Sequence, residues 1–175
     1  LVVDCAGAGT VRIVLNNADI TSATNSPIYV KECEKTIVTL ADGSSNTLKD
    51  AASYTYDDTV EEEPSACIFS KDDLYINGNG SLTVQANFND AIQSKDSLII
   101  LGGNITITSV DDGLIGKDMV LISGGTLTIT AEGDGIKSTN EESTEVGIVM
   151  IEGGTLNINT GGRSKNSTSS TSFAH

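Results

Sequence analysis

The segment GLIGKDMVLISGGTLTITAEGDGIKSTN, residues 113–140, decides the fold because its beginning is repeated near its end. The GLIGKD at Gly113 returns as GIKSTN at Gly135, and earlier copies are AIQSKD at Ala91 and CIFSKD at Cys67. The copies recur about every 22 residues, and similarity at such a short, nearly fixed period is typical of repeat architectures. In these architectures each unit packs on the next.

Each repeat contains three short strand patterns. One series is GSLTV, GNITIT, GTLTIT and GTLNIN, starting at Gly80, Gly103, Gly125 and Gly154, and another lies at 74–76, 98–100, 119–122 and 148–151. Alternation within the first series places its aliphatic residues inward: Ile105, Ile107, Leu127, Ile129, Leu156 and Ile158. We therefore predict an all-β, single-stranded, right-handed parallel β-helix with about 22 residues per coil.

The β-helix is expected to span residues 1–162. Strands at 11–20, 27–30 and 36–40 belong to two earlier coils, and residues 41–64 form an acidic loop that projects from the coil. The Ser/Thr-rich tail at 163–175 is expected to be disordered.

Charge limits the class of partner. Lys and Arg number 10 and Asp and Glu number 24, which gives a formal net charge of −14. Nucleic acid would be repelled, and an acidic polymer would be repelled unless a cation lay between it and the protein. The sequence contains no membrane span.

The cysteines and the first residues say less about the fold than the repeat does. Cys5, Cys33 and Cys67 are odd in number and unevenly spaced, so they predict neither a zinc site nor a disulfide framework but small buried apolar residues. The chain opens on the strand-like Leu1-Val2-Val3, from which we expect a longer precursor.

One acidic series has the period of the coil. Asp90, Asp112 and Asp134 recur once in each coil and should stack at one corner, with Asp111 beside them. Two bare carboxylates one coil apart repel by roughly 3–4 kcal/mol at an effective dielectric near 20. Oxygen ligands of this kind suit Ca²⁺, which would relieve the repulsion. The alternative is turn chemistry, because Asp before Gly is a favoured turn pair.

A second series follows the repeated SKD segments. Asp72, Asp96 and Asp118 should stack with Asn140, and Lys71, Lys95 and Lys117 should stack beside them. This is either a second metal column whose lysines meet an acidic ligand, or a set of turn caps neutralised by the lysines. We favour turn caps slightly for these aspartates.

Outward threonines form a third feature. Thr83, Thr106 and Thr128, and Thr108 with Thr130, would give a flat hydroxyl face that could meet a crystalline lattice such as cellulose or ice. Thr is also an ordinary outward strand residue, which is the interpretation we prefer.

The repeated SKD segments and GDGIKSTN at 133–140 resemble the bacterial carbohydrate-binding-domain-containing family of pectate-lyase-like β-helices, over nearly all of residues 1–160. The resemblance implies a secreted or surface-attached protein that binds calcium and plant cell-wall polysaccharide, including cellulose and acidic pectic chains. It implies metal-binding roles for Asp90, Asp111, Asp112 and Asp134, and then for Asp72, Asp96 and Asp118. Arg163 departs from the pattern, since a further Asp-Gly turn is expected there.

The leading hypothesis is calcium-dependent, non-catalytic binding of polygalacturonate or cellulose outside the cell. The predicted carbohydrate-binding residues are Lys71, Lys95, Lys117, Tyr54 and Tyr56. One alternative is a polysaccharide lyase, which needs a base near C5 of a uronate and Ca²⁺ to acidify that proton. Another is a structural β-helix that assembles end to end through its open ends.

Overall fold

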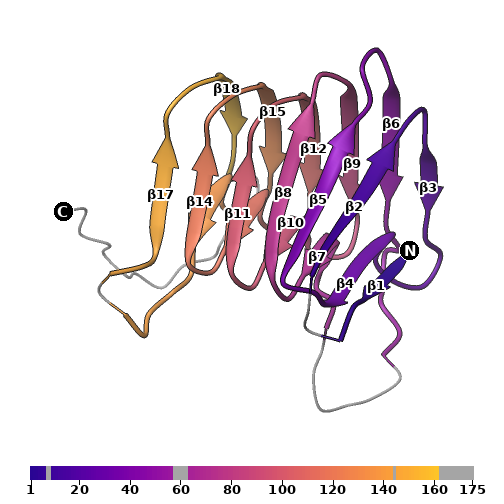
Figure 1. The fold of residues 1–175 in the computed structure, drawn as a ribbon, viewed down its shortest axis with the longest axis horizontal. Coiled ribbons are helices and arrows are strands. Elements are labelled where there is room, and N and C mark those ends of the chain that lie inside the picture. The colour runs from indigo at the N-terminus through magenta and orange to yellow at the C-terminus, as the bar shows by residue number, and fades with distance from the viewer. Residues whose placement is uncertain (7–8, 57–62, 144, 162–175) are drawn as a thin grey trace.

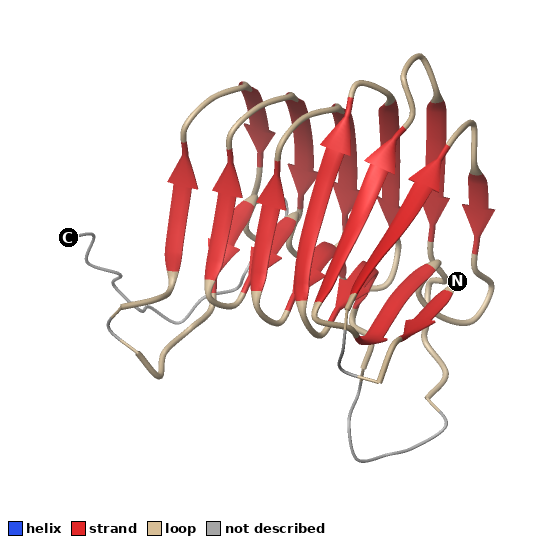
Figure 2. Ribbon diagram, viewed as in Figure 1, coloured by secondary structure: helices blue, strands red, loops and turns tan. Residues whose placement is uncertain are grey.

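The computed structural model describes residues 1–6, 9–56, 63–143 and 145–161. The chain is an all-β parallel solenoid of about six turns, with about 25 residues per turn. Its strands form three six-stranded parallel sheets, which face one another around the solenoid (Figures 1 and 2). The described part of the chain has no helix long and apolar enough to cross a membrane.

The three sheets take every third strand in turn. Sheet A contains β1 (Val2–Asp4), β4 (Ile28–Glu32), β7 (Ala66–Ser70), β10 (Asp90–Ser94), β13 (Leu114–Gly116) and β16 (Ile136–Ser138). Sheet B contains β2 (Thr10–Leu15), β5 (Lys35–Leu40), β8 (Asp73–Gly78), β11 (Ser97–Ile100), β14 (Met119–Ile122) and β17 (Ile148–Ile151). Sheet C contains β3 (Asp19–Thr21), β6 (Ser45–Lys49), β9 (Ser81–Ala86), β12 (Asn104–Ser109), β15 (Thr126–Ala131) and β18 (Thr155–Asn159).

The coil repeat read from the sequence holds in the middle of the solenoid. In sheet A, Ile68, Ile92, Leu114 and Ile136 are successive partners, as the spacing of the repeated segments predicted. The step from Ile28 to its partner Ile68 is much longer, because the chain makes its long excursion there. The predicted period therefore describes the central turns, and the right-handed sense stays a prediction.

The core consists of stacked aliphatic side chains, as the alternation predicted. Ile105 pairs with Leu127 and Ile107 with Ile129, and all four are buried. Leu156 and Ile158 continue the same columns in β18, but Leu156 is only partly buried and Ile158 is 42% exposed. Each turn buries the apolar face of its neighbour, which accounts for the full burial of these columns in the central turns.

The N-terminal third differs from the prediction in two places. The segment expected as one strand at 11–20 is two strands, β2 and β3, because Asn16 and Asn17 form a turn between them. The loop expected at 41–64 contains β6, which pairs with β3 and β9 and so belongs to the wall of the solenoid. The tail at 163–175, Arg163 included, lies outside the described residues.

The expectation that the cysteines are small buried apolar residues with no disulfide framework was wrong for two of the three. Cys5 and Cys33 form a disulfide, and only Cys67 is free and buried. Cys5 follows β1 and Cys33 follows β4, and these two strands are neighbours in sheet A. The bond therefore fastens the first turn of the solenoid to the second.

Reducing this disulfide is expected to destabilise the protein by about 3 to 4 kcal/mol, because the bond closes a loop of about 28 residues in the unfolded chain. For a chain of this size the melting temperature should fall by about 10 °C. Circular dichroism melting with and without reductant measures the change. The variant Cys5→Ser should already melt at the lower temperature, and reductant should not lower it further. Equal melting of oxidised and reduced wild type would contradict the prediction.

Candidate functional site

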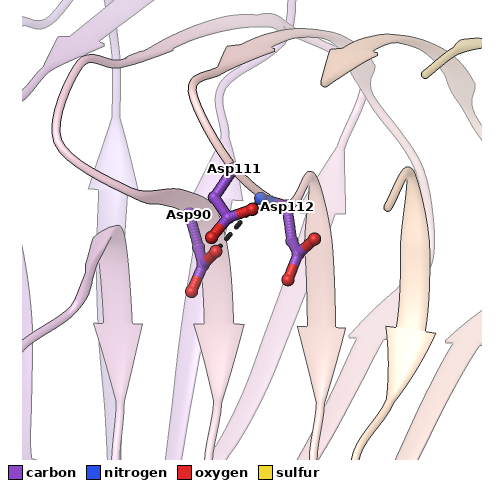
Figure 3. Close-up of side chains that lie close together, drawn as sticks. All are labelled: Asp90, Asp111 and Asp112. Atoms are coloured by element: carbon purple, nitrogen blue, oxygen red, sulfur yellow. Dashed lines mark hydrogen bonds between the residues drawn. The ribbon is translucent and has the colours of Figure 1, made fainter. Parts of the chain in front are cut away.

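The candidate site lies at the corner where the chain passes from sheet C to sheet A. Asp90 is the first residue of β10, and Asp112 and Asp134 lie at successive levels in the connections β12–β13 and β15–β16. Asp90, Asp111 and Asp112 each offer a carboxylate oxygen, and these three atoms lie within 4.8 Å of one another. Figure 3 shows the Asp111 side chain reaching toward Asp90, with Asp112 on the same turn as Asp111.

The vertical stacking of the aspartates is confirmed, and backbone amides maintain it. The amide of Asp112 donates to Oδ1 of Asp90 at 3.1 Å, drawn dashed in Figure 3. The amide of Asp134 donates to Oδ1 of Asp112 at 2.7 Å. Each carboxylate thus holds the next turn in place, so turn chemistry is one role of these residues. Asp134 stacks above the others but is not part of the group of three carboxylates.

Burial makes this corner electrostatically unfavourable for bare carboxylates. Asp90 and Asp112 are each 5% exposed. Burial raises the pKa of Asp90 to about 7, and the charges of Asp112 and Asp111 add to the rise, while the hydrogen bond from the Asp112 amide opposes it. Two ionised carboxylates about 4.8 Å apart repel by about 3 kcal/mol at an effective dielectric near 20. The corner therefore favours a positive charge.

Lys137 supplies one positive charge that the sequence did not predict. It lies on β16, and its Nζ forms an ion pair with Oδ2 of Asp112. Its equivalents on β13 and β10 are Ile115 and Gln93, so no lysine column marks the position in the sequence. Burial opposes the charge of Lys137, but the Asp112 carboxylate outweighs that effect and raises the pKa of the amine.

Gly133 leaves room for the carboxylates. A Cβ at this position would collide with oxygen atoms of both Asp111 and Asp112. Beside the Lys137 ammonium, oxygens of three carboxylates that are buried or half-buried meet here, and oxygen is the ligand that Ca²⁺ prefers. The residues present therefore fit a calcium ion held by Asp90, Asp111 and Asp112.

The second acidic series is engaged in turn contacts. Asp72 accepts a hydrogen bond from the amide of Cys33 at 2.6 Å, and Asn140 Nδ2 donates to Asp118 at 2.6 Å. The pKa of Asp96 is raised by burial and then by neighbouring carboxylates, Asp118 first. Within the described ranges, Asp90, Asp111 and Asp112 are the carboxylates grouped closely enough to hold a metal ion. These contacts agree with the turn-cap interpretation of Asp72, Asp96 and Asp118.

The three predicted lysines lie in one row at the ends of strands in sheet A. Lys71, Lys95 and Lys117 follow β7, β10 and β13 directly. Glu63 pairs with both Lys71 and Lys95 at 3.1 Å, and Glu142 lies 3.8 Å from Lys117. All three side chains remain between 34% and 41% exposed. The row therefore keeps positive groups accessible to a ligand.

Tyr54 fastens the connection between β6 and β7 to Phe88, and Tyr56 joins two points of that connection. The ring of Tyr54 stacks on Phe88 with centroids 4.2 Å apart, and its hydroxyl donates to Asp50 at 2.7 Å. Burial and then the contact with Asp50 raise the pKa of Tyr54. The hydroxyl of Tyr56 donates to the carbonyl of Pro64 at 3.0 Å. Phe88, which the sequence did not single out, precedes Asp90 by two residues.

Comparisons with known proteins agree with this architecture. A family model described as carbohydrate-binding domain-containing protein matches residues 1–174. A protein of Acetivibrio thermocellus with the same description is 48% identical over 95 residues, which are 54% of this chain and 33% of that protein. The chain thus spans about a third of the length of that relative.

A solved structure shares the fold. It is described as the polysaccharide lyase-like protein from C. thermocellum, in a gadolinium derivative, and it matches with a TM-score of 0.89 and 45% sequence identity. The match covers 91% of this chain and 64% of that one. Because the family match extends over almost the whole sequence, the chain belongs to the family of carbohydrate-binding domain-containing proteins.

Proposed function

We propose that this chain binds acidic plant cell-wall polysaccharide through calcium and does not cleave it. The observation that carries the proposal is the layout of sheet A. Strand β10 begins at Asp90, in the carboxylate group, and ends directly before Lys95, in the row of lysines. Lys95 lies five residue steps after Asp90 along the extended chain, about 16 Å. A ligand that reaches both features must contain several sugar units, so the layout favours a polymer.

A bound calcium ion would allow this acidic protein to bind an acidic polysaccharide. A protein with a net charge of −14 repels a polyuronate. A calcium ion held by Asp90, Asp111 and Asp112 would neutralise the buried carboxylates and present positive charge to the uronates of the ligand. The partly exposed ammonium groups of Lys71, Lys95 and Lys117 would then bind further uronates along the chain.

A polysaccharide lyase is the second candidate. The lyase-like description of the solved neighbour favours it, as does the position of Lys137 next to the carboxylates. The raised pKa of Lys137 argues against it, because a protonated amine cannot abstract the proton at C5 of a uronate. Release of unsaturated products that absorb in the near-ultraviolet would establish cleavage, and none is expected at alkaline pH with calcium present.

Secretion or attachment to the cell surface is part of the proposal. Plant cell-wall polysaccharide lies outside the cell, and the disulfide between Cys5 and Cys33 is of a kind that persists in oxidising compartments.

Binding to polygalacturonate is expected to be strong with calcium, to disappear in excess chelator and to return when calcium is restored. Affinity electrophoresis in gels containing polygalacturonate measures it, with cellulose pull-down in parallel. Magnesium is the control ion, because it demands near-ideal octahedral geometry and keeps its water ligands. Retardation that is unchanged in excess chelator would overturn the role of calcium, and binding to cellulose alone would overturn the preference for an acidic ligand.

A further inference from the structure

One carboxylate of the protein itself lies in the row of lysines. Oε2 of Glu63 is 3.1 Å from Nζ of Lys71, and Oε1 is 3.1 Å from Nζ of Lys95. Each oxygen therefore meets the ammonium group of a different turn. The Glu63 side chain is 19% exposed, whereas Glu142, which lies 3.8 Å from Lys117, is 83% exposed. Glu63 is thus held much more closely by the row than Glu142 is.

The two lysines stabilise the charged form of Glu63. Burial opposes the charge, but hydrogen bonds from Lys95 and Lys71 outweigh that effect and lower the pKa of the Glu63 carboxyl group. Charge-assisted hydrogen bonds of this kind are stronger than neutral ones. A uronate carries the same carboxylate group as Glu63. The pair of lysines therefore has the chemistry to bind a uronate in the same place.

The positive groups extend further than the contact with Glu63 requires. Val30 pairs with Ser70 in neighbouring strands of sheet A, so the residues that follow them, Lys31 and Lys71, stand at equivalent positions on successive turns. The side chain of Lys31 is exposed. Lysines thus continue from Lys117 to Lys31, at about 4.8 Å per turn. Repeated ammonium groups suit a ligand with repeated carboxylates, and Glu63 pairs with the two in the middle.

The residues that follow Glu63 lie along the path that the proposed function gives to the polysaccharide. Ser65 Oγ donates to Oε1 of Gln93 at 2.6 Å, and Nδ2 of Asn89 donates to the Ser65 carbonyl at 3.2 Å. Asn89 adjoins Asp90 at the corner of the three carboxylates, and Gln93 lies on the outer face of β10. The segment from Glu63 to Ser65 therefore lies between that corner and the row of lysines.

We propose that Glu63 takes the place of a uronate in the free protein, and that the polysaccharide replaces it at Lys71 and Lys95. The inference rests on the proposed function and adds a regulation of the same site, in which a carboxylate of the chain competes with the ligand. The ligand can pair with these two ammonium groups only when Glu63 has left them. Its apparent affinity is therefore reduced according to the fraction of the protein in which they are accessible.

Replacing Glu63 by Gln is expected to raise the affinity for polygalacturonate about fivefold at saturating calcium, because the side chain keeps its shape but no longer competes as an anion. Isothermal titration calorimetry of the variant and of wild type measures the change. Glu152→Gln is the matched control, since it makes the same change in net charge at an exposed side chain directly after β17, in sheet B. Its affinity should equal that of wild type.

A second measurement tests whether the two lysines cause the gain. In protein that already carries Lys71→Met and Lys95→Met, the change Glu63→Gln should leave the affinity unchanged, because no ammonium group is released. A gain that persists without these lysines would overturn the inference. So would an affinity of Glu63→Gln equal to or below that of wild type, and the proposed function would then still stand. Absence of polygalacturonate binding in both wild type and Glu63→Gln would overturn both.

Discussion

Replacing Asp111 by Asn is expected to weaken calcium binding about 100-fold, which corresponds to about 2.7 kcal/mol. The change keeps the shape of the side chain but removes one of the three charges that converge at the corner. Calcium prefers charged carboxylate ligands, and its affinity depends strongly on how many are present. Isothermal titration calorimetry measures the effect. The titration should be carried out at about pH 8. Burial raises the pKa of Asp90 to about 7, so at lower pH calcium would have to displace a proton from this carboxyl group.

Asp118→Asn is the matched control, because Asp118 belongs to the other acidic series and accepts a hydrogen bond from Asn140. Its calcium affinity should equal that of wild type. Loss of affinity in Asp118→Asn but not in Asp111→Asn would place the ion at the second series and contradict the assignment. Polygalacturonate binding should follow calcium binding in both variants, since calcium forms the bridge to the ligand in the proposed function.

The sequence predicted the stacked aspartates because, in a solenoid, residues separated by the length of one coil lie directly above one another in successive turns. Once Asp90 and Asp112 are separated by the length of one coil, they must occupy the same corner of successive turns. The same logic predicted the aliphatic columns, in which Ile107 lies directly under Ile129. Neither result depends on long-range information beyond the repeat itself.

Features that break the period could not be predicted in this way. The disulfide joins Cys5 to Cys33 in the least regular turns, where no repeat fixes which residues are neighbours. Lys137 enters the site through the reach of a long side chain from β16, at a position that is Ile115 in the turn before it. Such contacts depend on side-chain length and direction, which the spacing of residues does not specify.

The two interpretations of the aspartates are compatible once the individual oxygens are considered. In Asp90 and Asp112, Oδ1 accepts an amide hydrogen of the following turn, which is the turn chemistry. This leaves Oδ2 of Asp112 to Lys137. A calcium ion bound here, as proposed, would meet this ammonium, so we expect Lys137 to compete with the metal.

Replacing Lys137 by Met is accordingly expected to tighten calcium binding about tenfold, because a positive charge a few ångströms from the ion is removed while the length of the side chain is kept. Without calcium the same variant should melt at a lower temperature than wild type, since the buried carboxylate of Asp112 loses its partner. Calcium should therefore raise the melting temperature of Lys137→Met more than that of wild type. Lys117→Met is the control, because Lys117 pairs with Glu142 instead. Calcium affinity that falls in Lys137→Met would show that the lysine supports the ion rather than competing with it.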